Sequence, residues 1–219
     1  GNSSSQADVQ SVSPRIKVSN FIVARNTLQM GYDWLKSTKD GQAFLTFGCS
    51  SLSTSSLCGN GGADAGGNTY QIEHRSKGLY LRDVFDLTST DRVVVGYRRE
   101  SYSQIRNIDY GYGPSAFNAS GVAHAKEFEY SKSFKPNLVG YLRISQNFRI
   151  PNADDNSNVA YDASGPVLLR VQTSQDVDIG VNYQAGPVST GVSYFHSRTK
   201  NEIGYDPSGC GYACNVNYE

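Results

Sequence analysis

The feature that most constrains this chain is a two-residue period in its apolar side chains, clearest between Asp176 and His196. Apolar or aromatic residues, with one threonine among them, occupy every second position of 177–183 and again of 188–194. Such alternation is typical of a β-strand, whose successive side chains point to opposite faces of the sheet. The intervening Gln-Ala-Gly-Pro predicts a tight turn, so the stretch is a predicted hairpin with one apolar and one polar face.

Segments with the same period recur along the chain of 219 residues, and the connections between them alternate in length. The expected strands are 9–18, 21–36, 70–87, 92–108, 122–134, 138–147 and the two strands of the 176–196 hairpin. Tight turns at one edge and long loops at the other are typical of an outer-membrane barrel, whereas sandwiches mix connection lengths. The sequence therefore predicts an all-β, antiparallel, up-and-down transmembrane β-barrel segment of about eight strands, with short periplasmic turns and long extracellular loops.

The composition excludes several other classes of protein. The 20 basic and 20 acidic residues cancel, so bulk charge gives no indication of a nucleic-acid partner. No run of about 18 apolar residues is present, which excludes a transmembrane helix. Hydrophobic residues make up only 38% of the chain, and a membrane barrel tolerates this share because only alternate strand residues touch lipid. A soluble sandwich with its polar face in bulk solvent is the alternative fold.

Four cysteines form two close pairs, Cys49 with Cys58 and Cys210 with Cys214, in surroundings rich in Gly, Ser and Asn. Neither pair has the two-residue gap of a zinc knuckle. Two short disulfides that staple exposed loops outside the cytoplasm therefore fit better than a four-thiolate metal site.

No arrangement of residues predicts catalysis. The three histidines, His74, His124 and His196, are far apart, and no metal-binding His pair, nucleophile elbow or phosphate loop is present. The acidic stretch 154–156, with Asp162, is more often a solvated loop than a calcium site. The sequence predicts no catalytic residue, no metal site and no cofactor.

Three longer stretches share the motifs of a known protein family. Asp83–Tyr102, DVFDLTSTDRVVVGYRRESY, joins an acidic-aromatic strand end to a strand that begins Asp-Arg. Leu138–Asn152 is similar to a Y-x-x-Y-S-x-G-F-R-x-P segment, and Gln172–Ile203 to an E-x-S-x-x-Y-E-x-G-x-K-Y hairpin. All three resemble the barrel strands of TonB-dependent outer-membrane receptors, and they occur in that family's order within residues 15–219.

The resemblance implies a barrel of about 22 strands that is plugged by an N-terminal globular domain. Such receptors import a scarce ligand, often a ferric siderophore, with energy from the TonB complex. Residues 1–219 are then expected to be part of one β-barrel domain, with the plug domain and the remaining strands absent. The expected location is the bacterial outer membrane, with the loops extracellular. The expected partners are outer-membrane lipid, a ferric chelate or other small ligand, and the TonB complex through the missing N-terminal part.

Aromatic and basic side chains in the predicted external loops are the candidates for ligand capture, because they can stack on and neutralise an anionic chelate. They are Tyr110, Tyr112 and Phe117 in one loop, and Arg149 and Tyr161 in the next. Two other functions remain as alternatives. One is a secreted or surface soluble β-protein that binds a partner or a glycan, and the other is a small eight-stranded structural or adhesion barrel.

Overall fold

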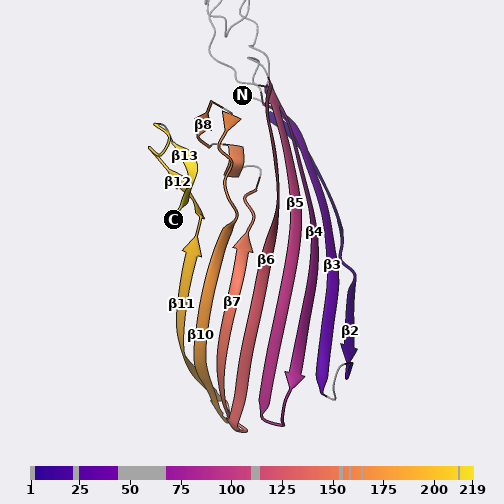
Figure 1. Cartoon of the computed structure of the whole chain (residues 1–219), viewed down its shortest axis with the longest axis vertical. Coiled ribbons are helices and arrows are strands. Elements are labelled where there is room, and N and C mark those ends of the chain that lie inside the picture. The colour runs from indigo at the N-terminus through magenta and orange to yellow at the C-terminus, as the bar shows by residue number, and fades with distance from the viewer. Residues whose placement is uncertain are drawn as a thin grey trace, which may run out of the picture. The chain divides into compact units, whose positions relative to one another are not determined.

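Figure 1 shows the computed structural model of the chain, which describes residues 3–21, 25–43, 68–109, 114–152, 155–157, 159–163, 165–211 and 213–219. Nine strands form one sheet in the order β1-β3-β4-β5-β6-β7-β10-β11, and β2 also pairs with β3. These strands are β1 (Ser3–Val12), β2 (Arg15–Ser19), β3 (Asn26–Ala43), β4 (Asn68–Asp86), β5 (Asp91–Asp109), β6 (Pro114–Lys135), β7 (Leu138–Arg149), β10 (Gln172–Ala185) and β11 (Val188–Lys200).

Smaller elements follow β7 and β11. A 3₁₀ turn (Asp155–Ser157) precedes the two-residue strands β8 (Tyr161–Asp162) and β9 (Gly165–Pro166), which pair with each other. After β11, β12 (Glu202–Asp206) pairs with β13 (Cys214–Tyr218). Among the residues that the structure describes, no helix has the length and apolar character to cross a membrane.

From β3 to β11, strands of the main sheet that follow one another in the sequence are neighbours, and β1 and β2 both pair with β3. This arrangement confirms the predicted all-β, up-and-down order. Two-residue turns join β6 to β7 and β10 to β11, and both lie at the same end of the sheet (Figure 1). The backbone N–H of Gln184 donates to the carbonyl of Asn137 across these two turns, at 2.9 Å. Gly186 has a φ of 54° in the second turn, a left-handed conformation that glycine adopts without steric cost.

The prediction of one strand over 9–18 is wrong, because the structure ends β1 at Val12 and begins β2 at Arg15. Pro14 lies between them, and proline has no backbone N–H with which to continue a ladder of hydrogen bonds. The next strand was predicted from Phe21, and the structure begins β3 at Asn26. Asn20 and Arg25, which precede β3, both have positive φ. The break between β1 and β2 divides the predicted first strand in two, so the sheet has nine strands.

The chain divides into two compact units. The first comprises Gly1–Ser11, Trp34–Ser76 and Tyr102–Gly121, and the second comprises Val12–Asp33, Lys77–Ser101 and Val122–Glu219. The polar clusters, the loop-end contacts and the apolar rows described below all lie within the second unit.

The second unit presents one apolar and one polar face, as the strand period predicts. On β10 and β11, Ile179 lies opposite Tyr194, and Val181 lies opposite Val192. This side of the sheet is named the apolar face. Its side chains are open rather than packed, since Ile179 is 49% exposed and Val192 is 80% exposed. A soluble sandwich would bury such a row against a second sheet, so this surface has the character of one that meets lipid.

The β12–β13 hairpin was not predicted, because its strands of five residues are too short to show a clear period. A disulfide joins Cys210, in its connecting turn, to Cys214, the first residue of β13, with 6.1 Å between the two Cα atoms. The second cysteine pair therefore closes a hairpin. Cys49 and Cys58 lie outside the described residues.

Candidate functional site

The polar face of the second unit holds the charged side chains that alternate with the apolar rows. Its first cluster centres on Asp33 of β3, which pairs with Arg98 of β5 at 2.7 Å and with Arg15 of β2 at 3.3 Å. Arg98 also pairs with Glu100 at 2.7 Å, and Arg15 donates to the Tyr80 hydroxyl at 2.7 Å. The cluster joins four strands through side chains that are only partly buried, so its charges are both neutralised and hydrated.

A second cluster on the polar face links β4, β6 and β7. Glu127 accepts a hydrogen bond from Nε of Arg82 at 2.8 Å and lies 3.9 Å from a guanidinium nitrogen of Arg143. Gly96 of β5 provides the space for it, because a Cβ at this position would lie 2.9 Å from Cγ of Glu127. The absence of a side chain at Gly96 of β5 therefore leaves room for the Glu127 side chain of the neighbouring β6.

A third cluster lies on β7, β10 and β11. The Asp176 carboxylate accepts hydrogen bonds from the Asn147 amide at 2.8 Å and from the Ser174 and Ser197 hydroxyls at 3.0 and 2.5 Å. Asp178, two residues further, accepts from the Tyr141 hydroxyl at 3.2 Å. The hydrogen-bond donors to these carboxylates are neutral, and the cation near them is Arg143, which lies directly opposite Asp178 on β7.

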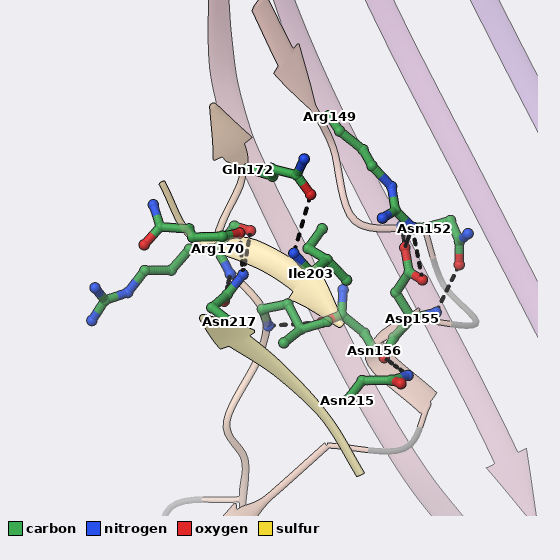
Figure 2. Close-up of polar contacts among 11 residues, drawn as sticks. Arg149, Asn152, Asp155, Asn156, Arg170, Gln172, Ile203, Asn215 and Asn217 are labelled. Carbon is green, nitrogen blue, oxygen red and sulfur yellow. Dashed lines mark hydrogen bonds and ion pairs between the residues drawn. The ribbon is translucent and has the colours of Figure 1, made fainter. Parts of the chain in front are cut away.

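The loop end of β7 and β10 forms a separate cluster that includes a predicted ligand residue (Figure 2). Arg149 donates from Nη2 to both carboxylate oxygens of Asp155, at 3.2 and 3.1 Å. The backbone N–H of Asp155 donates to the side-chain oxygen of Asn152 at 2.7 Å, and the backbone N–H of Asn152 donates to the Asp155 carboxylate at 2.9 Å. This reciprocal pair is of the capping-box type and fixes the 3₁₀ turn that begins at Asp155.

Asparagine side chains fasten the β12–β13 hairpin to the same cluster, as Figure 2 shows. The Asn215 amide donates to the carbonyl of Asp155 at 2.7 Å. Asn217 accepts from the Arg170 backbone N–H at 2.7 Å and donates to the Asn201 carbonyl at 2.8 Å. Because these bonds satisfy backbone groups outside regular strands, they hold the hairpin in a defined position beside Arg149.

The structure places the five predicted ligand residues in different settings. Arg149 ends β7 with a side chain that is 48% exposed. Phe117 was predicted in a loop, but it lies in β6 and is only 9% exposed, with the Arg106 guanidinium carbon 5.9 Å from its ring centre. Tyr161 is the first residue of β8, and its side chain lies outside the described part. Tyr110 and Tyr112 also lie outside the described residues.

Sequence reasoning missed the partners of Arg149. Asp155 was considered only as part of an acidic loop, and Asn215 and Asn217 were not considered. The spacing Asn-x-x-Asp at 152–155 is a local signal for a capped turn and could have been recognised. The contact from Asn215 joins residues that are 60 positions apart, so no local pattern indicates it.

The charged polar face is suited to contact with water and polar solutes. Within the described part of the chain, no group of three or more His, Cys, Asp or Glu residues could hold a metal ion. An up-and-down sheet with an open apolar face and a hydrated, charged opposite face has the features of the wall of a membrane β-barrel.

The comparison with protein families also indicates a membrane β-barrel. The model of the family described as TonB dependent receptor-like, beta-barrel matches residues 3–218, so the chain belongs to this family. The resemblance seen in the strand motifs is therefore confirmed, and so is the predicted fold, a segment of a receptor barrel. The family is one of outer-membrane transport receptors rather than enzymes. No curated protein matches the chain in sequence.

Solved structures of such barrels share the fold at low sequence identity. The alcaligin outer-membrane receptor FauA from Bordetella pertussis matches with a TM-score of 0.62 and 15% identity, over 98% of this chain and 34% of that one. The copper transporter OprC matches with a TM-score of 0.67 and 14% identity, over 98% and 34%. The FrpB iron transporter from Neisseria meningitidis matches with a TM-score of 0.62 and 13% identity, over 97% and 31%. The chain spans about a third of the length of these structures.

Proposed function

We propose that this chain forms part of the barrel wall of an outer-membrane receptor that imports a scarce ligand, such as a ferric siderophore. The family match over residues 3–218 is the observation on which the proposal rests. The similarity to an alcaligin receptor and an iron transporter supports a ferric chelate as the class of cargo. Energy for import would come from the TonB complex, which would act through a part of the receptor outside this chain.

The proposed orientation places the short turns in the periplasm and the Arg149 cluster outside the cell. In outer-membrane barrels, the periplasmic connections are short and the external ones are long. The two-residue turns of β6–β7 and β10–β11 lie at one end of the sheet, and the β12–β13 hairpin lies toward the other (Figure 1). Ligand would then meet the loop end first and the polar face afterwards.

Arg149 is the proposed contact for the anionic part of the ligand. Both of its hydrogen bonds to Asp155 leave from Nη2, so Nη1 could bind a second oxygen anion while the pair stays intact. The Asp155 carboxylate holds the guanidinium in place, which reduces the entropy lost when a ligand binds. Tyr110, Tyr112, Phe117 and Tyr161 remain proposed ligand contacts. Because Phe117 is buried with the Arg106 guanidinium over its ring, the side chains that cover the ring would have to move before a ligand could reach it.

The proposal is tested with the native polypeptide extracted from membranes with nonionic detergent. Its intact mass is measured first, and a mass several times that of 219 residues is expected for a plugged receptor. Binding of a panel of ferric chelates is then followed by quenching of tyrosine and tryptophan fluorescence. Uptake of the bound chelate by cells with and without an active TonB complex completes the test. A polypeptide that is soluble without detergent and binds none of the chelates would contradict the proposal.

The role of Arg149 is tested by Arg149→Ala, with Arg170→Ala as the matched control. The Arg170 contacts to Asn217 use backbone atoms and survive truncation of its side chain. Loss of a charge-assisted hydrogen bond of about 1.5–3 kcal/mol should weaken chelate binding roughly tenfold to a hundredfold in Arg149→Ala and leave Arg170→Ala unchanged. Equal affinities in the two variants would remove Arg149 from the site.

A further inference from the structure

Toward the loop end, a row of basic and amide side chains crosses the apolar face of β6, β7, β10 and β11. The members of this row lie directly opposite one another on successive strands: Lys126, Gln146, Gln175 and Arg198. The next row toward the short turns consists of Phe128, Ile144, Val177 and His196. The face therefore changes from mainly apolar to cationic within one two-residue step, about 7 Å along the strands.

Further cations occupy the same face on neighbouring strands. By strand alternation, Lys77 shares its face with the exposed Leu79 of β4, and Arg99 shares its face with the exposed Tyr97 of β5. No described carboxylate forms an ion pair with Lys77, Arg99, Lys126 or Arg198, whereas the described arginines in the polar-face clusters are all paired. The outward cations are thus available to a partner outside the chain.

The height of this row matches the edge of a membrane. Arg198 lies about ten residues from Val188, where β11 leaves its turn, and ten residues of strand extend about 33 Å. At a tilt of about 40°, this length spans about 25 Å, which is the height of the apolar band of an outer-membrane barrel. Tyr97 and His124 stack nearby on the same face, with ring centres 5.9 Å apart, as aromatic side chains do at membrane interfaces.

A shallow depression of about 450 Å³ lies at the same boundary. Its lining includes six members of the two rows: Lys126, Gln146, Gln175, Phe128, Ile144 and Val177. Glu127, Ser145 and Asp176 also line it, and strand alternation places them on the polar face. The members from the first row offer a cation and amides, and the members from the second row offer apolar side chains. Such a surface complements a molecule with an anionic head and an apolar chain.

We propose that this boundary binds the phosphate groups of anionic membrane lipids, with Lys126 and Arg198 as the cationic contacts. Three strand spacings, about 14 Å, separate the two residues, so each would engage its own phosphate. The amides of Gln146 and Gln175 would donate to headgroup oxygens between them, and the acyl chains would lie over Phe128, Ile144 and Val177. The inference rests on the membrane location in the proposed function, and goes beyond it in assigning a lipid site.

The test measures lipid retention by the native polypeptide in nonionic detergent, by native mass spectrometry, after addition of phosphatidylglycerol or phosphatidylcholine. The wild type should retain phosphatidylglycerol preferentially. Lys126→Gln combined with Arg198→Gln should weaken its binding about fivefold for each removed charge, the factor that corresponds to about 1 kcal/mol per basic residue at an anionic surface. Lys135→Gln, at the other end of the same strand, is the control and should bind as the wild type does.

Three results would overturn the proposal: equal retention of the two lipids by the wild type, an equal loss in Lys135→Gln, or displacement of the lipid by millimolar inorganic phosphate. The charge-preserving variant with Lys126→Arg and Arg198→Lys separates recognition from misfolding, because it should retain phosphatidylglycerol. If the polypeptide needs detergent and imports its ligand but shows no preference between the lipids, this inference alone fails. If it is soluble and binds neither lipid nor chelate, the proposed function fails as well.

Discussion

Replacement of Val192 by arginine distinguishes most directly between a lipid-facing and a water-facing apolar face. Val192 is 80% exposed on β11 and lies directly opposite Val181. It is about four residues from the short turn, which places it about 10 Å above that edge at the usual strand tilt, near the middle of an apolar band about 25 Å high. A cation at the bilayer midplane should cost about 2–4 kcal/mol of folding free energy. In water, a substitution at so exposed a position should change stability by less than about 0.5 kcal/mol.

The assay is reversible unfolding by guanidinium of the native polypeptide in phosphatidylcholine vesicles, followed by tryptophan fluorescence. The matched control is Ser193→Arg, which places the same side chain one residue further along β11 on the opposite face. We expect a large loss of stability for Val192→Arg and little change for Ser193→Arg. Wild-type stability of Val192→Arg, or equal losses in the two variants, would refute the assignment of the apolar face to lipid.

Two further predictions concern close packing and pH. Gly180 lies directly opposite Tyr141, and a Cβ at position 180 would lie 2.7 Å from the Tyr141 ring. Gly180→Val should therefore lower the free energy of unfolding by about 1–3 kcal/mol in a denaturant titration, and Tyr141→Ala in the same chain should recover part of this loss. Additive losses in the double variant would contradict this steric account. The pH prediction concerns Asp91 at the β4–β5 turn. Hydrogen bonds to its carboxylate, of which the one from the Thr88 hydroxyl has the largest effect, hold its pKa well below the usual value of 3.8. This carboxylate stabilises the fold above pH 3.8, and the contribution is lost as the pH falls toward the lowered pKa of the folded state. The thermal midpoint of Asp91→Asn should accordingly fall less than that of the wild type between pH 6 and pH 3, and parallel falls would contradict the assignment.

Short-range patterns in the sequence were sufficient to predict the strands and their turns. The period of two along 177–183 and 188–194 predicted a hairpin with Ile179 and Val192 on one face, and the structure pairs these strands in that register. Two-residue turns need only local chemistry, such as the positive φ of Gly186. The break at Pro14 could also have been predicted, because proline cannot donate to the ladder within a strand.

The candidate site could be predicted only in part from the sequence. Arg149 was identified by its charge and by its place after a strand, but the structure shows that Asp155 already binds it. Phe117 was expected in a loop because of the glycines before it, whereas β6 already begins at Pro114 and Phe117 is buried. The alternation that marks the middle of a strand gives no sharp signal for where a long strand ends.

The sequence by itself determined the strand period, the short turns and the existence of one apolar and one polar face, because each depends on neighbouring residues. The tertiary structure decided which charges meet. Arg15 and Tyr80 are 65 residues apart, and Arg82 and Glu127 are 45 apart, yet each pair forms a hydrogen bond across the polar face. The cationic row from Lys126 to Arg198 likewise exists only in the sheet, since a shift of one residue in the pairing of any strand would turn its side chains to the other face.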